Sequence, residues 1–261
     1  MKHVIAVSAY GESPFLEQCL SSLKQQKHGG DVVICTSTPG DFINKLAWKY
    51  NIPVYERDGE PGLADDWNFC IAVARDLDAD FVTIAHQDDR YLPDYSWKVT
   101  RVFEFGQIPF VCTRCENKDE HGHAFTGKAE KVKRFLRWPL SIWALTGTGF
   151  GKLHALRFGN AIACPTVTYN LGLLEGDLFD SGYRFVTDWE ALRKIALMPG
   201  QIICVEEPLV EIRLHDDSET KSRTDDGTRE KEEAEMLEKM NPKWLAGLIK
   251  KFYRPSEVYG K

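Results

Sequence analysis

The first ninety residues alternate between short apolar runs and amphipathic stretches, and this alternation restricts the fold more than any other feature of the sequence. Each apolar run has the length and composition of a buried strand, and each stretch between two runs has apolar residues at helical spacing. The expected strands are Val4–Ser8, Asp31–Thr36, Ile52–Glu56 and Phe81–Ala85. The expected helices are Ser13–Gln26, Asp41–Tyr50 and Gly62–Leu77. Strands that alternate with helices pair in parallel through crossover connections, so we expect an α/β fold with a parallel sheet flanked by helices.

The fourth apolar run is followed by two adjacent carboxylates, Asp88 and Asp89. Because a parallel sheet presents its ligands at the carboxyl ends of its strands, acids at this position point into a crevice. Two neighbouring carboxylates repel each other unless a cation neutralises them, and oxygen ligands favour Mg²⁺ or Mn²⁺. These ions typically bind phosphate oxygens as well, so the pair is a candidate metal and phosphate site. The alternative is a solvated loop that carries two surface acids.

Composition excludes several classes of protein. The chain has 261 residues, a net charge of −6 and 43% hydrophobic residues, and the negative charge argues against a nucleic-acid-binding protein, whose surface is usually basic. No stretch approaches the roughly 18 apolar residues of a transmembrane helix, and the N-terminus lacks a signal-peptide pattern. Seven cysteines are more typical of reduced thiols than of a disulfide framework. We therefore expect a cytoplasmic protein.

The remaining chain has a less regular pattern. We expect a helix over Tyr95–Phe105, a strand over Phe110–Arg114, a helix over Phe185–Leu197, strands over Ile202–Glu206 and Leu209–Leu214, a charged helix that ends at Met240 and a last helix after Pro242. Thr187 and Glu190 have the spacing of a capping box at the start of the Phe185–Leu197 helix.

Two segments resemble well-known binding motifs, and we reject both interpretations. Gly147–Leu153 is one residue short of a phosphate-binding loop and has leucine where a metal-binding Ser or Thr belongs, so it is interpreted as a mobile loop. Cys112 and Cys115, with His121 and His123 after them, suggest zinc. If the strand from Phe110 continues through Cys115, however, the two sulfur atoms point to opposite faces of the sheet.

An ordered set of motifs resembles a known enzyme family. The motifs are Ser8-Ala-Tyr10 after the first strand, the acid pair, Asn160-x-Ile-x-x-Pro165-Thr-Val, Thr187-Asp188-Trp189-Glu190 with Arg193, and Ile212-Arg213-Leu214-His215. In this order they are similar to the inverting family 2 glycosyltransferases of GT-A fold, over residues 3 to 222. The resemblance implies a GT-A domain over residues 1–222, with a nucleotide-binding half (1–94) and an acceptor-side half (95–222). A helical extension would cover residues 223–261.

The resemblance implies a nucleotide-sugar donor and a metal. UDP-sugars are favoured, with dTDP- or GDP-sugars as alternatives. The residues on the donor side would be Ser8 and Tyr10, which frame the base, together with Thr36, Asn68 and Asp88. Asp88, with Asp89 beside it, would bind Mn²⁺ or Mg²⁺, and His215 would close over the diphosphate and reach the metal.

The resemblance also places Asp188 where the family has its catalytic base, with Trp189 and Glu190 on the acceptor side. Inverting transfer needs a base on the acceptor hydroxyl, and Trp189 would partly exclude water around Asp188. The alternative is that Asp188 complements the dipole at a helix N-terminus. The acceptor would be a glycan or a lipid-linked glycan.

The sequence departs from the family pattern at three places. His86 replaces the first acid of the metal-binding segment, the second strand ends in Thr36-Ser37-Thr38 where many relatives have an acid, and the Gln-x-x-Arg-Trp motif of processive synthases is absent. A single-transfer enzyme therefore fits better than a synthase. A sugar-nucleotide pyrophosphorylase needs a glycine-rich loop after the first strand, but that loop contains only Gly11. A non-catalytic sugar-nucleotide binding module is the other alternative.

Basic and aromatic residues gather in two stretches of this acidic chain. The first is Lys131–Trp143, and the second is the last helix, with Trp244, Leu248 and Lys251. Such stretches favour peripheral contact with an anionic membrane surface. The alternative, favoured for the last helix, is that its apolar face packs on the domain and its lysines lie in water. The sequence does not indicate an oligomeric state.

Overall fold

The structure is a computed structural model, and it describes residues 1–119, 121–125, 128–214 and 227–252. In this part of the chain nine strands form one sheet in the order β3-β2-β1-β4-β8-β6-β9-β5, and β7 pairs with β6. The strands are β1 (His3–Ala9), β2 (Asp31–Thr36), β3 (Val54–Glu56), β4 (Phe81–His86), β5 (Arg90–Tyr91), β6 (Phe110–Lys118), β7 (Ala124–Phe125), β8 (Val167–Asn170) and β9 (Ile202–Arg213).

The sheet is mostly parallel, as the sequence predicts. β1 pairs in parallel with β2 and β4, β2 with β3, and β6 with β9. β8 lies antiparallel between β4 and β6, while β5 and β7 are antiparallel to their neighbours. Six of the nine described strands therefore run in one direction, and their carboxyl ends lie at one edge of the sheet.

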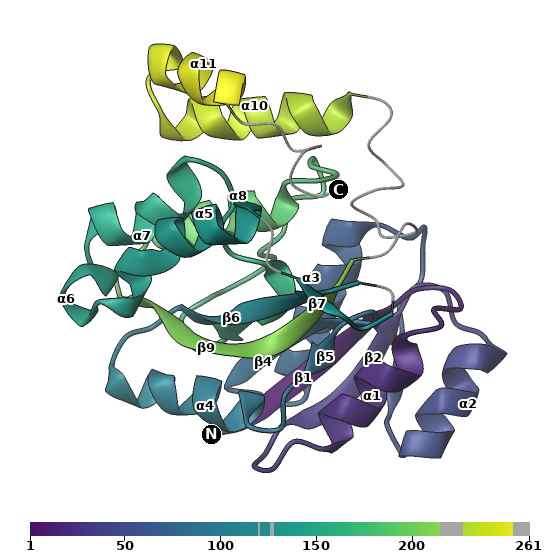
Figure 1. The fold of residues 1–261 in the computed structure, drawn as a ribbon. Coiled ribbons are helices and arrows are strands. Elements are labelled where there is room, and N and C mark those ends of the chain that lie inside the picture. The colour runs from purple at the N-terminus through teal and green to yellow at the C-terminus, as the bar shows by residue number, and fades with distance from the viewer. Residues whose placement is uncertain (120, 126–127, 215–226, 253–261) are drawn as a thin grey trace.

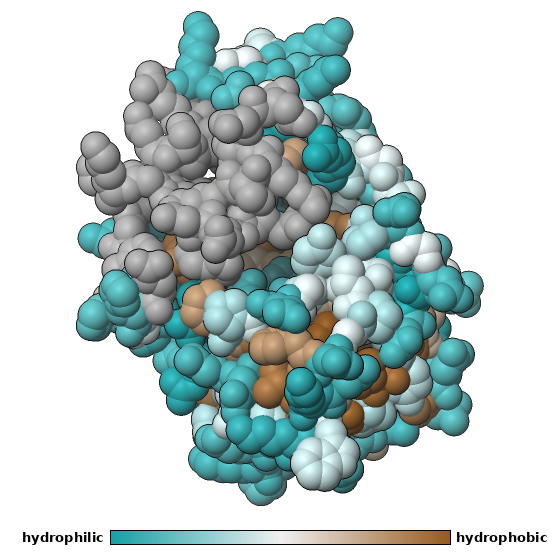
Figure 2. All heavy atoms as spheres, turned by 90° about the vertical axis from the view of Figure 1, so that its right-hand side faces the viewer, coloured by the Kyte–Doolittle hydropathy of each residue, from teal (hydrophilic) through white to brown (hydrophobic). Residues whose placement is uncertain are grey.

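Helices cover both faces of the sheet (Figure 1). They are α1 (Leu16–Lys24), α2 (Asp41–Tyr50), α3 (Leu63–Asp76), α4 (Tyr95–Val102), α5 (Lys128–Arg137), α6 (Trp143–Thr146), α7 (Gly149–Arg157), α8 (Thr187–Ala196), α10 (Thr228–Met240) and α11 (Lys243–Phe252), with short 3₁₀ helices η1 (Phe103–Phe105), η2 (Trp138–Ser141) and η3 (Cys164–Thr166). None of the described helices has both the length and the apolar content that a bilayer crossing requires. The face with α1 and α2 is mostly hydrophilic, with a small apolar area near its middle (Figure 2).

The alternation of side chains along β1 explains why both faces are covered. Val4 and Ala6 belong to a core shared with α3, α7, α8 and α10, while Ile5 and Val7 belong to a core shared with α1, α2 and α4. Successive side chains of a strand point to opposite faces, so a continuous apolar run requires helices on both. Cys112 and Cys115 of β6 lie in these two different cores.

The predicted C-terminal helices form the outermost layer on one side of the molecule (Figure 1). Met236 and Leu237 of α10 and Ala246 of α11 are buried in the core that contains α8. Asn241, between the two helices, accepts a hydrogen bond from Nε of Arg157 (2.9 Å) and donates one to the Arg157 carbonyl (2.9 Å). The extension is therefore packed against the part of the chain that contains α7 and α8.

Three local expectations are wrong. The residues at 147–151 are not a loop throughout, because Thr148 caps α7 by accepting a hydrogen bond from Gly151 N. The predicted strands at 202–206 and 209–214 are one strand, β9, whose register shifts near Pro208, a residue that cannot donate to the ladder. Thr187 does not form a capping box, since its hydroxyl donates to the Asp180 carbonyl and Glu190 binds Arg193.

A buried polar network joins β1 and β4 to α4. His3 Nδ1 lies 2.8 Å from Ser96 Oγ, and Nε2 lies 2.9 Å from Thr83 Oγ1. The Thr83 hydroxyl also contacts Thr168 Oγ1 at 2.8 Å and Tyr95 OH at 3.2 Å. Burial lowers the pKa of His3 from 6.5 to about 3, so the imidazole is neutral at pH 7.

The first prediction concerns this histidine. In the unfolded chain His3 binds a proton below pH 6.5, whereas in the folded chain it does not until about pH 3. Its contribution to stability is therefore complete above pH 6.5 and is lost below that pH, by up to about 1.4 kcal/mol per pH unit. The difference in unfolding free energy between the wild type and His3→Gln should shrink as the pH falls from 7 to 5 in urea titrations.

His28 provides the control because it is exposed. The difference between the wild type and His28→Gln should stay constant over the same pH range. A constant difference for His3→Gln as well would contradict the buried, neutral assignment of His3.

Candidate functional site

The loops that follow β1, β2 and β4 converge at the carboxyl edge of the sheet, where hydrogen bonds join them. Gln87 Oε1 accepts from Tyr10 N at 2.9 Å, and Gln87 Nε2 donates to the Tyr10 carbonyl at 3.0 Å. Gly11 N donates to Thr38 Oγ1 at 2.8 Å. Ser8 lies on β1 between Cys35 and His86 in the strand register. The structure therefore brings Ser8, Tyr10 and the acid-pair segment together.

Asp88 is half-buried at this edge and is oriented by a residue near the start of α1. Ser13 Oγ donates to Asp88 Oδ1 at 2.6 Å and accepts from Phe15 N at 3.3 Å. Arg213, near the end of β9, donates from Nε to the Asp88 carbonyl at 3.4 Å. The Arg213 guanidinium also lies 4.3 Å from the ring centroid of Phe15.

Asp89 and His86, the neighbours of Asp88, have different environments from it. Asp89 is buried and accepts a hydrogen bond from Arg213 N at 3.1 Å, and burial raises its pKa to about 8. The His86 ring stacks on Trp67 with the centroids 5.3 Å apart, and burial lowers its pKa to about 4. His86 Nε2 is buried and has no hydrogen-bond partner among the described residues. Such an atom is suited to bind a ligand.

Of the acid pair, only Asp88 fits a metal site, and that site would be completed by phosphate oxygens and water. In the described ranges, no group of three or more His, Cys, Asp and Glu side chains is arranged to bind a metal. Mg²⁺ and Mn²⁺ are commonly bound by one or two carboxylates together with phosphate oxygens and water. Asp88 fits this arrangement, whereas Asp89 is largely protonated near pH 7 and is bound to Arg213. Its role as a ligand stays a prediction, and His215 lies outside the described residues.

Asp188 lies at the start of α8, in the other half of the chain. Asn160 Nδ2 donates to its Oδ2 at 2.8 Å, and Trp189 N donates to its Oδ1 at 2.7 Å. Burial raises the pKa of Asp188 to about 6, although the Trp189 N–H and the charges of Lys133 and Arg229 act in the opposite direction. A carboxylate with this pKa is unprotonated at pH 7 and is a stronger base than an ordinary aspartate.

Cys164 connects the two acidic regions in space. It lies in η3, which packs against β4, and its thiol pKa is raised by burial and by the charges of both Asp188 and Asp89. Next to it, the Pro165 carbonyl accepts a hydrogen bond from Tyr91 OH at 2.8 Å. The segment that starts at Asn160 thus contacts the base candidate at one end and the strand after the acid pair at the other.

Glu232 of α10 fixes the chain that leads into α8. Its carboxylate accepts hydrogen bonds from the backbone N–H groups of Arg184 (3.0 Å), Phe185 (2.9 Å) and Val186 (3.3 Å). These three residues directly precede α8. An acid from the C-terminal extension therefore holds the segment that leads into the helix that begins with Thr187 and Asp188.

Two of the expected donor-side residues are bound to the protein. Thr36 is buried, and its Oγ1 accepts from Thr38 N at 3.0 Å. Asn68 donates to the Phe179 carbonyl at 2.8 Å and accepts from the N–H groups of Leu178 and Phe179 at 3.0 Å. In these positions Thr36 shapes the loop after β2, and Asn68 holds the segment before α8 against α3.

The expected acceptor-side residues are also buried. Trp189 is 2% exposed, and its Nε1 donates to the Leu156 carbonyl at 2.9 Å. Glu190 is 3% exposed and binds Arg193 at 2.6 Å and Lys239 at 3.5 Å. Both side chains anchor α8, to α7 and to α10 respectively, and neither presents an open surface next to Asp188.

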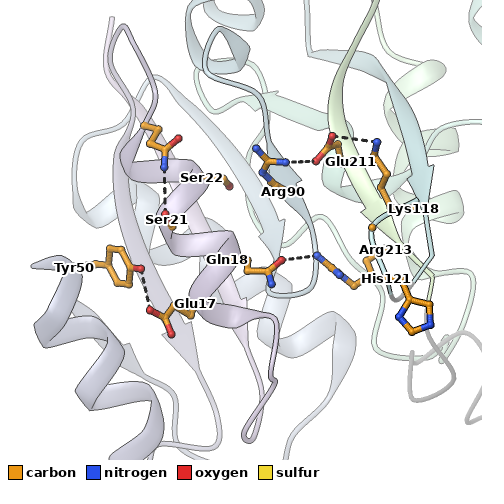
Figure 3. Close-up of a pocket in the computed structure, with 12 residues that line it drawn as sticks. Glu17, Gln18, Ser21, Ser22, Tyr50, Arg90, Lys118, His121, Glu211 and Arg213 are labelled. Carbon is orange, nitrogen blue, oxygen red and sulfur yellow. Dashed lines mark hydrogen bonds and ion pairs between the residues drawn. The ribbon is translucent and has the colours of Figure 1, made fainter. Parts of the chain in front are cut away.

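A separate cavity of about 620 Å³ lies between α1 and the strands β5, β6 and β9 (Figure 3). Two of its cations, Arg90 and Lys118, bind Glu211 at 3.0 and 3.5 Å, and Arg213 donates to Gln18 at 2.7 Å. Arg213 belongs both to this cavity and to the region of the acid pair.

Sequence reasoning missed three residues of this site. Gln87 and Ser13 act through bonds to Tyr10 and Asp88, and the sequence offered only their nearness to the motifs as a signal. The sequence did not indicate the role of Glu232, because this residue lies in a charged helix more than forty residues after its partners. Asn160 was noted as part of a motif, but its bond to Asp188 was not foreseen.

No protein-family model matches the chain, and no curated protein matches it. Several solved structures, however, are similar to the chain. The chain is similar to S. aureus TarS 1–349 in complex with UDP-GlcNAc, with a TM-score of 0.65 and 16% identity over 98% of this chain and 72% of that one. It is also similar to the mannosyltransferase PcManGT from Pyrobaculum calidifontis in complex with GDP-Man and Mn²⁺, with a TM-score of 0.68 and 15% identity over 98% of this chain and 72% of that one.

A longer structure of S. aureus TarS matches over 92% of this chain, with a TM-score of 0.63 and 15% identity. The chain spans 43% of that structure. At such identities the likeness establishes the fold alone. The chain has the GT-A fold that these glycosyltransferase structures share, which confirms the fold expected from the sequence.

The second prediction concerns Glu232 of α10. Glu232→Ala removes the acceptor of three backbone N–H groups and should lower the unfolding free energy by at least about 2 kcal/mol, the scale of hydrogen bonds to a buried charge. Chemical denaturation at pH 7 measures the change. Glu230→Ala on the exposed side of the same helix is the control and should change it by less than about 0.5 kcal/mol. Equal effects of the two substitutions would contradict the role of Glu232 in holding the segment before α8.

Proposed function

We propose that the chain is a single-transfer, inverting glycosyltransferase of family 2, which moves a sugar from a nucleotide-sugar donor to a hydroxyl of a glycan or lipid-linked acceptor. The observation that carries the proposal is the environment of Asp188. Its carboxylate is oriented by Asn160 and by Trp189 N, burial raises its pKa to about 6, and it lies across Cys164 from the segment that follows β4. A helix-dipole role alone does not require a side-chain clamp and a raised pKa.

The chemistry of inversion assigns a role to this carboxylate. The acceptor oxygen attacks the anomeric carbon on the face opposite the nucleoside diphosphate, and the bond from that carbon to the diphosphate oxygen breaks. Asp188 accepts the proton that the acceptor hydroxyl loses, as a general base. Asn160 holds the carboxylate in place, which keeps its basic oxygen directed at the acceptor.

The donor would bind at the carboxyl ends of β1, β2 and β4. Ser8 and Tyr10 line the place expected for the base, and the unpartnered Nε2 of His86 is available to hydrogen-bond the ribose or the sugar. Asp88 would hold Mn²⁺ or Mg²⁺, which stabilises the charge of the departing diphosphate. The UDP-GlcNAc in TarS, and the GDP-Man and Mn²⁺ in PcManGT, support this class of donor and cofactor. A UDP-sugar is the favoured donor.

The third prediction tests the base. Asp188→Asn keeps the shape of the side chain but cannot accept a proton, so it should lower turnover at least about a hundredfold and leave the affinity for the donor nearly unchanged. In the wild type, turnover at saturating donor should rise about tenfold per pH unit below pH 6 and level off above it, because only unprotonated Asp188 acts as a base. The variant's residual activity should lack this dependence.

Asp177→Asn, an exposed acid between β8 and α8, is the matched control and should retain full activity. Transfer rates are measured with a panel of UDP-, GDP- and dTDP-sugars, and donor affinity is measured by calorimetry. A variant Asp188→Asn that binds the donor weakly but turns it over at the normal rate would exclude the role of general base.

The fourth prediction tests the metal site. Asp88→Asn should abolish transfer and remove the Mn²⁺-dependent part of the thermal stabilisation by a nucleoside diphosphate, because an amide is a weak ligand for a hard cation. Asp94→Asn in the following loop is the control and should keep both properties. Full activity of Asp88→Asn would place the metal elsewhere. If the wild type binds a donor but neither transfers nor hydrolyses its sugar with Mn²⁺, the chain is a sugar-nucleotide binding module.

A further inference from the structure

One segment of this acidic chain is strongly basic. Residues 128–158 contain seven Lys and Arg residues and one acidic residue, Glu130, although the whole chain has a net charge of −6. Glu130 is bound to Arg137 at 2.6 Å. Lys131 and Arg134 are exposed on α5 and form no ion pair in the described part of the chain. This segment therefore presents uncompensated positive charge to solvent.

The same segment exposes large aromatic side chains. Phe135 is 67% exposed, Trp138 51%, Trp143 56% and Phe150 63%. Exposed single apolar residues are common, but these four large aromatic rings lie on helices that pack against one another. Figure 1 shows α5, α6 and α7 together on one side of the molecule, and contacts join α7 to α5 and to α6.

Three of these four rings contact a neighbouring aromatic or imidazole ring. The His154 ring lies 5.8 Å from Phe135 and 5.3 Å from Phe150, measured between centroids. Trp143 lies 6.3 Å from Phe105, which is itself exposed. We call the exposed residues of this region the basic–aromatic surface; they are Phe105, Lys131, Val132, Arg134, Phe135, Trp138, Trp143 and Phe150.

We infer that the basic–aromatic surface docks the protein on an anionic lipid bilayer. Lys and Arg are attracted to the negative surface of such a bilayer, and aromatic rings insert at the level of the headgroups. Charge complementarity favours this occupant, because residues 128–158 carry a net positive charge in a chain whose net charge is −6. Binding that combines charge with inserted rings depends on anionic lipid and weakens with salt.

The C-terminal helix is a weaker candidate for the same role. Trp244 on α11 is 73% exposed, but Lys250 is paired with Glu238 at 2.6 Å, and α10 beside it is rich in glutamate. The acidic neighbour opposes approach to an anionic surface. Of the two stretches that the sequence singles out, the first therefore carries the inference.

The position of α5 relates this surface to the candidate site. The outward side of the helix bears Arg134 and Phe135, while Arg137, on the buried side, donates to the Ala161 carbonyl next to Asn160. Asn160 in turn holds Asp188. If the proposed function is correct, a bilayer on the outer side of α5 would supply a lipid-linked acceptor next to the base. The membrane contact itself does not depend on that function.

Flotation of the full-length chain with vesicles tests the contact. Vesicles of phosphatidylcholine with 30% phosphatidylglycerol should carry the wild type upward at 50 mM salt, and vesicles of phosphatidylcholine alone should not. Lys131→Glu with Arg134→Glu should weaken binding at least about tenfold, since each basic residue near the surface contributes strongly. Phe135→Ser with Phe150→Ser should weaken it even where the charge is kept.

The matched control is Lys45→Glu with Trp48→Ser on α2, which removes one exposed cation and an exposed tryptophan from the opposite part of the molecule. It should bind as the wild type does, and circular dichroism should show that all variants are folded. A wild type that stays unbound at low salt, or a control that loses as much binding as the α5 variants, overturns the inference. Flotation is measured without a donor, so its result does not depend on the proposed function. A chain that floats but shows no transfer in the activity assays would refute only the proposed function.

Discussion

The parallel register of β1 with β2 and β4 is the constraint on which the rest of the site depends. Because the three strands run in one direction, the loops after Ala9, Thr36 and His86 emerge at the same edge of the sheet. Side chains then fix these loops against one another, through Gln87 on the Tyr10 backbone and Thr38 on Gly11 N. The sheet thus supplies the meeting point, and a few hydrogen bonds determine the shape of the crevice.

The base candidate is placed by contacts of a different kind. Asp188 is not on the sheet, and its position depends on Asn160 from the segment before β8 and on Glu232 of α10, which binds the segment that leads into α8. These partners are 28 residues before it and more than forty after it in the chain. The C-terminal extension therefore helps to position the base candidate.

The sequence predicted the strands and helices of the sheet region well, but it did not predict the contacts between distant segments that place Asp188. β2 and α2 have the expected boundaries, because a short continuous apolar run predicts a buried strand and apolar residues at helical spacing predict a helix. The convergence of Tyr10 with the acid pair follows from parallel pairing alone. The local signal of a capping box failed because another partner binds the same group: the Thr187 hydroxyl donates to the Asp180 carbonyl. The partners of Asn68 and Trp189 lie 111 and 33 residues away, and no sequence period reports such contacts.

The charge at the end of β4 explains how a histidine would be compatible with the proposed diphosphate site. His86 is neutral at pH 7, because burial against Trp67 lowers its pKa to about 4, and Asp89 is largely protonated, because burial raises its pKa to about 8. Asp88 thus lies between two neutral side chains, those of His86 and Asp89.

A second carboxylate at position 86 would be buried against an indole ring and would repel both Asp88 and an approaching diphosphate. The imidazole avoids that repulsion and offers the unpartnered Nε2 as a hydrogen-bonding group. Negative charge is therefore concentrated on Asp88, which favours a metal that binds together with the phosphates of the donor over one that is held by the protein alone.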